Sequence, residues 1–350
     1  MMQWKDLSYL TNQFILRYCL IATNKGVGNM KTGKIKCTDG YLDISKMILG
    51  AGSFGSELPK DLSFEMMDRY FQVGGRAIDT GRIYMAWVHN GASKSEKTVG
   101  EWIRSRGVRN QITLITKGGH PEFRNITYSR LAPECIEYDI NTSLAVLGVD
   151  YVDTYFLHRD DENIPVGEIM DVMDQLIKDG LTRSIGASNW SIKRILEANR
   201  YAIEHGKTPF TVSQIQWNMA ECKREDLLDK TCLCMTKEEY EGYRNTDIPV
   251  MAYSPQAVGF FSKYLISGEK NLSARARVFL TEENIKRAKK VDEICKKIGC
   301  TPAALCIAFI TCNPVDGYAI IGNSSMHQME DTLTALDLIV EPDVIDWILE

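Results

Sequence analysis

The stretch Arg76-Ala77-Ile78-Asp79-Thr80-Gly81-Arg82-Ile83-Tyr84 brings an acid and a tyrosine together at the end of an apolar segment. Ala77 and Ile78 are typical of a buried strand, and Thr80-Gly81 can end it, so Asp79 is expected at a strand's C-terminal end. Folds of the α/β class place their chemistry at that edge of the sheet. A strand-end aspartate by itself is more often a helix cap or turn former, so a functional role requires partners elsewhere in the chain.

Strand-like and helix-like segments alternate on both sides of this stretch. Eight strands are expected, over Met47–Gly50, Arg76–Asp79, Ile112–Thr116, Val152–His158, Arg183–Ala187, Val212–Gln216, Val250–Tyr253 and Tyr318–Ile321. Helical patterns begin near Asp61 and recur over Ser95–Arg106, Leu131–Leu147, Val166–Asp179, Ile192–Glu204, Lys223–Gly242, Glu282–Lys297 with Pro302–Thr311, and Met326–Leu338. Glycines follow several of these helices and prolines open others, as expected at helix ends.

Eight βα units without a linker between them predict one closed barrel. We therefore expect the α/β class and a single-domain (β/α)8 TIM barrel over residues 46–350, preceded by an N-terminal extension and lead-in over residues 1–45. A doubly wound parallel sheet is the alternative. Two insertions stand out, Gly118–Ser129 after the third strand and Gln256–Thr281 after the seventh, which carries Phe260, Phe261 and Tyr264. Loops at these strand ends are where a barrel builds a substrate pocket.

Composition narrows the class of protein and its partners. The chain has 350 residues, of which 44% are hydrophobic and 25% charged, as in an ordinary globular protein with a large core. A formal net charge of −5 offers no basic field for a polyphosphate backbone, so neither nucleic acid nor a membrane surface is an expected partner. A small molecule is expected instead, and the sequence assigns no oligomeric state.

The cysteines and the first residues bear on the compartment. The ten cysteines include no C-x-x-C pair and no histidine spacing for zinc, so we interpret them as reduced thiols of a cytoplasmic protein. The apolar piece over residues 14–22 is interrupted by Arg17 and is too short to span a bilayer. Because Met30 could itself begin a complete protein, we treat residues 1–29 as an appendage of unknown role.

A glycine motif follows the first strand and suggests a dinucleotide fold. Gly50-Ala51-Gly52-Ser53-Phe54-Gly55 matches G-x-G-x-x-G, and Asp79 lies downstream, where a ribose-binding acid would be expected. In a Rossmann fold, however, the helix opens within the glycine motif so that its N-terminus meets the pyrophosphate. Here the helical pattern begins only near Asp61, and the separation to Asp79 is long, so this fingerprint is disfavoured.

Four residues at consecutive strand ends make chemical sense together. Asp79 ends the second strand and Tyr84 lies shortly after it, Lys117 directly follows the third strand, and His158 ends the fourth. A tyrosine is a weak acid with a free pKa of about 10, and a nearby ammonium favours its phenolate. A carboxylate keeps that ammonium charged and oriented, while an imidazole can hydrogen-bond the reacting oxygen. The set is suited to protonating a carbonyl oxygen while hydride reaches its carbon.

With these residues in place, the sequence resembles the aldo-keto reductases from about Met47 to the C-terminus. The matching segments are Ala77-Ile78-Asp79-Thr80 with Tyr84, Ile115-Thr116-Lys117, Leu147-Gly148-Val149-Asp150-Tyr151-Val152-Asp153 leading to His158, Ile185-Gly186-Ala187-Ser188-Asn189-Trp190, Gln214-Ile215-Gln216-Trp217-Asn218 and Ala252-Tyr253-Ser254-Pro255. The resemblance implies NAD(P)H-dependent reduction of an aldehyde or ketone. It implies Tyr84 as the general acid, Asp79 and Lys117 as its tuning pair, and His158 as the group that orients the substrate.

The same resemblance implies a cofactor site that involves no metal. The residues it places at the cofactor are Gly52, Ser53, Asp79, Ser188, Asn189, Gln214, Tyr253, Ser254, Gly322, Ser324 and Gln328, and it places Phe54, Tyr84 and His158 at the substrate. Ser188, Asn189 and Gln214 suit the carboxamide, and Tyr253 offers a face for the nicotinamide ring. NADP-preferring members often carry an arginine where Gln328 stands and an asparagine where Thr332 stands. We nevertheless favour NADP(H) over NAD(H), because Ser324 and Ser325 can donate to a phosphate.

Substrate identity and two other functional classes stay open at this point. Arg159, Asp160 and Asp161, with His120 and Arg124, predict a polar rim that favours a sugar-like carbonyl compound over a greasy ketone. Asp160, Asp161 and Glu162 also resemble metal ligands, although their spacing equally fits a solvated turn, which we prefer. One alternative is a cofactor-binding regulatory or partner subunit with little turnover. Another is a barrel lyase with a Schiff base on Lys117, which the nearby Asp79 disfavours.

Overall fold

The strands form a closed parallel ring. The computed structural model describes residues 29–123, 125 and 128–350. The ring order is β10-β3-β4-β5-β6-β7-β8-β9, and β10 pairs with both β3 and β9. The strands are β3 (Met47–Gly50), β4 (Ala77–Asp79), β5 (Thr113–Gly118), β6 (Thr154–Leu157), β7 (Ile185–Ser188), β8 (Val212–Gln216), β9 (Val250–Tyr253) and β10 (Gly317–Ile321). The predicted (β/α)8 TIM barrel is confirmed, and the doubly wound sheet is wrong.

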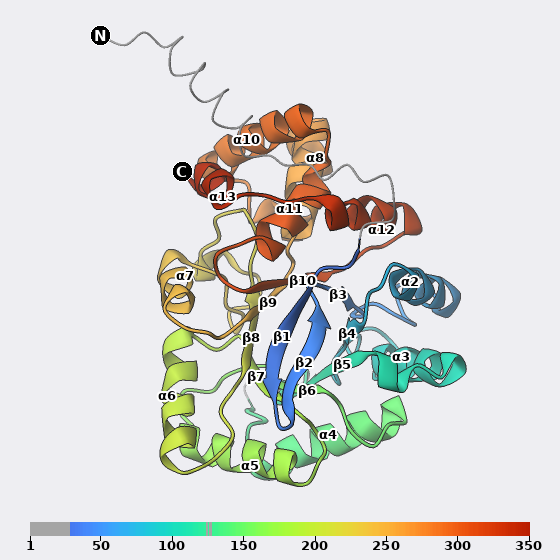
Figure 1. Cartoon of the computed structure of the whole chain (residues 1–350), viewed down its shortest axis with the longest axis vertical. Helices are drawn as coiled ribbons and strands as arrows, with labels where there is room; N and C mark the ends of the chain where they lie inside the picture. Colours follow the sequence, from blue (N-terminus) through green and yellow to red (C-terminus); the bar gives the residue numbers. More distant parts are fainter. Residues whose placement is uncertain (1–28, 124, 126–127) are drawn as a thin grey trace.

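The helices surround the ring (Figure 1). They are α2 (Lys60–Gln72), α3 (Lys94–Arg106), α4 (Pro133–Leu147), α5 (Val166–Lys178), α6 (Ile192–Glu204), α7 (Lys237–Arg244), α10 (Glu282–Ile298), α11 (Pro302–Thr311) and α12 (Met326–Leu333). Helix α11 shows how the chain sets their limits: the Thr301 hydroxyl caps its first turn and Pro302 occupies its first position. A left-handed glycine, Gly148, ends α4.

A hairpin that the sequence did not reveal closes the bottom of the barrel. Strands β1 (Thr32–Cys37) and β2 (Gly40–Ser45) pair antiparallel and lie across the barrel in Figure 1. Ile35 and Ile44 pack into the same apolar cluster as Ile115 and Phe156, which point from the strands into the barrel. The hairpin thus seals the N-terminal end of the strands and leaves the C-terminal end as the open face.

Two predicted helices are wrong in part. Within Lys223–Gly242, only the short turn η2 (Arg224–Asp226) and the start of α7 are helical. The segment between them runs beside β8 instead, where Gln216 and the backbone of Leu233 and Met235 exchange hydrogen bonds. The helix expected over Met326–Leu338 consists of α12 followed by the 3-10 helix η5 (Thr334–Asp337), and an unpredicted helix, α13 (Pro342–Leu349), follows.

The second insertion is structured rather than open. It contains η3 (Ala257–Gly259), α8 (Phe260–Ser267), η4 (Gly268–Asn271) and α9 (Ala274–Arg277), while the 3-10 turn η1 (Arg109–Gln111) precedes β5. Phe260 and Phe261 are fully buried, and Tyr264 stacks on Phe260 with ring centroids 5.5 Å apart. The aromatic residues that marked this loop as a pocket wall therefore belong largely to the core.

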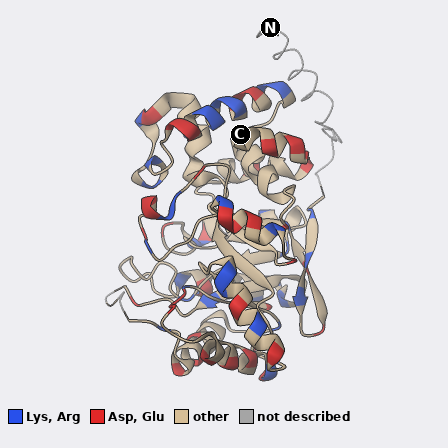
Figure 2. Cartoon of the chain, turned by 90° about the vertical axis from the view of Figure 1, so that its left-hand side faces the viewer, with Lys and Arg blue, Asp and Glu red and all other residues tan. Residues whose placement is uncertain are grey.

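Three further features concern the N-terminal segment, possible membrane-spanning helices and the surface charge. The predicted appendage over residues 1–29 lies, except for its last residue, outside the described residues. Across the part of the chain that the structure describes, no single helix is long and apolar enough to cross a membrane, and the bent pair α10 and α11 meets that test only jointly. Figure 2 shows acidic and basic residues interspersed along the helices that face the viewer.

Candidate active site

A large hollow opens at the C-terminal ends of the strands. Its volume is about 670 Å³, and it is lined by residues that follow β3, β4, β9 and β10. Asp79 and Tyr84 lie among its lining residues, as do Gln328 and Thr332 from α12. The hollow therefore extends from Asp79, at the end of β4, to helix α12.

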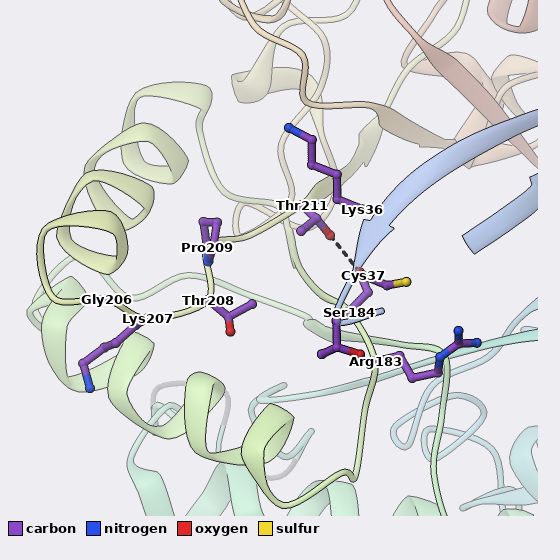
Figure 3. Close-up of a pocket in the computed structure, with 10 residues that line it drawn as sticks. Lys36, Cys37, Arg183, Ser184, Gly206, Lys207, Thr208, Pro209 and Thr211 are labelled. Atoms are coloured by element: carbon purple, nitrogen blue, oxygen red, sulfur yellow. Dashed lines mark hydrogen bonds between the residues drawn. The ribbon is translucent and has the colours of Figure 1, made fainter. Parts of the chain in front are cut away.

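A smaller hollow of about 380 Å³ lies at the opposite end of the barrel. Figure 3 shows that its charged residues turn away from one another. Arg183 pairs with Asp39 and Asp153, and Lys207 pairs with Asp171. Two of its three cations are thus paired with acids outside its lining, and the lining residues that the structure describes include no histidine and no acid.

Asp79 is the hub of the buried polar cluster at the open face. Lys117 Nζ lies 2.6 Å from Asp79 Oδ1 and also donates to the Thr80 carbonyl at 2.8 Å. Gln214 Nε2 donates to the other carboxylate oxygen at 3.0 Å. Lys117 and Asp79 are 0% and 1% exposed, so the ion pair is shielded from water and strongly oriented.

Tyr84 joins this pair from the loop after β4. Its hydroxyl donates to Asp79 Oδ1 at 3.4 Å, and Lys117 Nζ lies 4.8 Å from the centre of its ring. The backbone N–H of Tyr84 donates to Gly81 O, which fixes the turn that returns the side chain to the strand end. Burial and the Asp79 charge hold the pKa of Tyr84 well above its usual value, so the hydroxyl keeps its proton at neutral pH.

His158 lies against Tyr84, with ring centroids 5.6 Å apart and edge-on geometry. Burial, with the charges of Arg159 and Lys117 and the neighbouring His120, holds the pKa of His158 well below its usual value, so the ring is neutral. Its Nδ1 atom is buried and has no hydrogen-bond partner among the described residues. The structure thus brings together all four residues that the strand-end pattern singled out.

Arg159 lies inward rather than on the polar rim predicted for it. It is only 8% exposed. Its guanidinium donates to the His158 carbonyl at 2.8 Å, to Asp229 at 2.9 Å and to Thr231 at 2.7 Å. Burial opposes ionisation of Asp229, but hydrogen bonds from Thr231 and the Arg159 charge outweigh it and lower its pKa to about 2. This ion pair anchors the loop before α7 over the site.

The neighbouring acids point elsewhere. Asp160 lies 3.5 Å from the guanidinium of Arg194 on α6. Asp161 accepts hydrogen bonds from the backbone and side chain of Asn163, which is the pattern of a local turn. Across the described ranges, no group of three or more acidic, histidine or cysteine side chains is arranged to hold a metal ion.

Asn189 and Gln214, which are expected at the nicotinamide carboxamide, lie close to the Asp79 cluster and already form hydrogen bonds with other residues. The Asn189 side chain accepts from Tyr253 OH at 2.8 Å and from Leu233 N at 2.9 Å, and it donates to the His158 carbonyl and to Ser188 Oγ. Gln214 uses its amide nitrogen on Asp79. Tyr253, Ser254, Gly52 and Ser53 line the hollow directly.

The far end of the hollow is polar and more exposed. Ser324 donates both its N–H and its hydroxyl to Gln328 Oε1, at 2.9 and 2.8 Å, and Ser325 caps α12. Of the two serines predicted to donate to a phosphate, Ser324 has both its N–H and its hydroxyl bonded to Gln328, while Ser325 Oγ accepts from Gln328 N. Asn323 Oδ1 is buried without a partner among the described residues.

Two cations that the sequence interpretation missed line the hollow. Lys263 on α8 and Arg275 on α9 both face it. Neither forms a salt bridge with another described residue. Both residues lie in the insertion Gln256–Thr281, which follows the C-terminal end of a strand. Basic residues in such a loop are a sequence signal for an anion site, but the prediction for this insertion rested only on its aromatic residues.

A barrel whose open face carries a buried Asp–Lys pair, a protonated tyrosine and a neutral histidine defines an oxidoreductase of the carbonyl-reducing class. Comparison with known proteins agrees. The model of the Aldo/keto reductase family matches residues 46–348, and the chain belongs to that family. Its members typically use NAD(P)H.

Individual relatives are distant but match along most of their length. The chain is 26% identical over 316 residues to norsolorinic acid reductase of Emericella nidulans, covering 86% of this chain and 76% of that protein. It is 24% identical over 337 residues to an aryl-alcohol dehydrogenase [NADP(+)] of Phanerodontia chrysosporium, covering 88% and 82%. An uncharacterized oxidoreductase of Bacillus subtilis is 24% identical over 314 residues, covering 87% and 91%.

Proposed function

We propose that this protein reduces an aldehyde or ketone to the alcohol with NADPH. The observation that carries the proposal is the placement of Tyr84, whose hydroxyl shares Asp79 Oδ1 with the Lys117 ammonium and whose ring lies against His158. Asp79 and Tyr84 line a hollow large enough for a cofactor and a small substrate, and Lys117 and His158 contact these two residues.

Each of these side chains has a defined task. Tyr84 Oη donates its proton to the carbonyl oxygen, and the Lys117 ammonium stabilises the phenolate that remains. Asp79 keeps Lys117 charged against the burial that lowers its pKa. His158, neutral at physiological pH, hydrogen-bonds the carbonyl oxygen and orients it toward Tyr84. When bound, the reduced nicotinamide supplies the hydride.

The residues along the hollow fit a dinucleotide. Tyr253, Gly52, Ser53 and Ser254 line the hollow together with Asp79 and Tyr84. The remaining residues expected at the nicotinamide are bonded to this lining: Asn189 accepts from the Tyr253 hydroxyl and donates to Ser188, and Gln214 donates to Asp79. At the other end, Gly322, Ser324 and Gln328 precede and open α12, whose N-terminus favours an anion. The partnerless Asn323 oxygen is a further acceptor there.

Lys263 and Arg275 supply positive charge for the cofactor's phosphates, and NADPH presents one phosphate more to them than NADH does, at the ribose 2′ position. The fungal relative named for NADP(+) supports the same choice. Gln328 is the point against it, because this residue occupies the Ser324 donors and brings no charge. The preference is therefore expected to be moderate.

One experiment tests the reductase and its alternatives together. Purified protein is titrated with NADPH and with NADH by fluorescence, and then supplied with NADPH and 4-nitrobenzaldehyde while the absorbance at 340 nm is followed. Tight NADPH binding with turnover is expected. Tight binding without turnover of any carbonyl compound would instead identify a regulatory subunit. Borohydride trapping of a carbonyl compound on Lys117 would identify a lyase, which the Lys117–Asp79 pair disfavours.

A further inference from the structure

A second histidine stands at the site, beside the four residues of the proposed mechanism. His120 follows the last residue of β5 by two positions, and its ring lies edge-on to His158 with centroids 4.9 Å apart. On its other side it lies against Phe123, at 5.4 Å, which in turn lies against Trp87 at 5.3 Å. His120 is 6% exposed, so its ring is almost completely buried beside His158.

The hydrogen bonding of His120 fixes where its proton lies. Nδ1 is 2.6 Å from the carbonyl oxygen of Pro121, and a carbonyl oxygen only accepts, so Nδ1 carries the hydrogen. Burial and the charge of Arg159 lower the pKa of His120 to about 4, so a second proton is not held at neutral pH. Nε2 is therefore a lone-pair acceptor.

That acceptor has no partner among the residues that the structure describes. Within the described ranges no hydrogen bond reaches His120 Nε2, and the atom is not among the fully buried atoms without partners, so it is reachable from the site. The proposed mechanism already gives the carbonyl oxygen two donors, Tyr84 and His158. His120 Nε2 lies beside these two donors and is a hydrogen-bond acceptor. A simple aldehyde or ketone has no hydroxyl hydrogen to donate to it.

We propose that His120 is a specificity-determining residue, and that the substrate carries a hydroxyl group on the carbon next to its carbonyl and donates that hydroxyl to His120 Nε2. The inference rests on the proposed reductase function and names its substrate class, an α-hydroxy aldehyde or ketone. The two neighbouring oxygens of such a compound match two neighbouring imidazoles, one donating and one accepting. Phe123 and Trp87 form the apolar rim beyond them.

An analogue without the hydroxyl leaves His120 Nε2 desolvated and unpaired. An unpaired buried polar group costs about 1–3 kcal/mol, which corresponds to roughly fivefold to 150-fold in kcat/KM. Because the hydroxyl is bound equally in the ground and transition states, the loss falls mainly on KM rather than on kcat.

The test uses matched substrates that differ by that hydroxyl, 2-hydroxyacetophenone with acetophenone and lactaldehyde with propanal. The ratio of their kcat/KM values is measured for the wild type, His120→Phe and His120→Gln. Intrinsic reactivity and the fraction of active protein cancel when the ratio of a variant is divided by that of the wild type. We expect His120→Phe to lower the ratio at least fivefold through KM, and His120→Gln, whose amide oxygen is an acceptor, to restore part of it. His205→Phe, a change at a histidine stacked on Tyr201 on the outer helix α6, is the matched control and leaves the ratio unchanged.

Two outcomes overturn the inference in distinguishable ways. If 4-nitrobenzaldehyde and the other carbonyl compounds are reduced but His120→Phe leaves the ratio as it is, the inference fails and the reductase stands. If no carbonyl compound is reduced with NADPH, the proposed function fails and the inference with it.

Discussion

The two ends of the hollow are built on different principles. At the Tyr84 end, an ion pair that is almost completely buried orients every group, and each carboxylate oxygen of Asp79 is occupied. At the α12 end, exposed residues hydrogen-bond to one another, as Ser324 does to Gln328. A buried charge tolerates little change, because removing one partner leaves the other uncompensated. An exposed polar contact is worth much less and can be exchanged. Chemistry is thus expected to be rigid at one end, and cofactor preference adjustable at the other.

The largest effect is expected at the rigid end. Tyr84→Phe removes the donated proton while keeping the ring against His158, so kcat should fall by about a thousandfold, within the range for a general acid. NADPH affinity, measured by fluorescence titration, should change less than twofold. Tyr41→Phe, on the hairpin at the opposite end of the barrel, serves as the control. A variant that keeps a tenth or more of the wild-type rate would remove Tyr84 from the proton-donor role.

An intermediate effect is expected midway along the hollow. Lys263→Met and Arg275→Met each remove a cation that faces it, so the dissociation constant for NADPH should rise about tenfold, or about 1.4 kcal/mol, with kcat retained at saturation. The salt dependence of binding should become shallower in both variants. Lys270→Met removes an exposed charge from η4 nearby as a matched control. Unchanged affinity in both variants would move the phosphate site elsewhere.

A smaller effect is expected at the adjustable end. Gln328→Arg frees the two Ser324 donors and adds a guanidinium, so the ratio of NADH to NADPH dissociation constants should rise by about fivefold to tenfold. Gln328→Ala frees the same donors without adding charge and separates the two contributions. A ratio that falls in Gln328→Arg would show that the 2′-phosphate does not reach α12.

Sequence alone predicted the rigid end because its residues obey a local rule. Asp79, Lys117 and His158 each end a strand of apolar residues, and a closed barrel brings consecutive strand ends together. The ring of eight strands followed from the same periodicity.

The parts that sequence missed depend on contacts that no local pattern encodes. Arg159 pairs with Asp229, a residue 70 positions away on a loop expected to be helical. Gln328 occupies donors that, as sequence, appeared free for a phosphate. The β1–β2 hairpin places only a few apolar residues, among them Ile35 and Ile44, into the barrel, which is too few for a periodic signal.

The last prediction concerns pH and expects almost no effect. The pKa of Tyr84 lies well above its usual value and that of His158 well below, so neither group changes charge between pH 5.5 and 8. The groups that face His158 are Arg159 and Lys117, both cationic, and His120, whose pKa of about 4 keeps it neutral. Burial and then these cations disfavour a proton on His158, so we expect the ring to stay uncharged when the pH is lowered to 5.5.

The rate kcat/KM for reduction should therefore vary less than twofold over that range, measured at constant ionic strength with 4-nitrobenzaldehyde. Arg159→Met removes one of the two cations, so the pKa of His158 should rise toward its usual value of about 6.5 and an acidic limb should enter the profile. An inflection near pH 6.5 in the wild type would mean that His158 titrates at the usual histidine pKa and is therefore exposed to water. The contrast between a rigid, buried end and an adjustable, exposed one would then no longer hold.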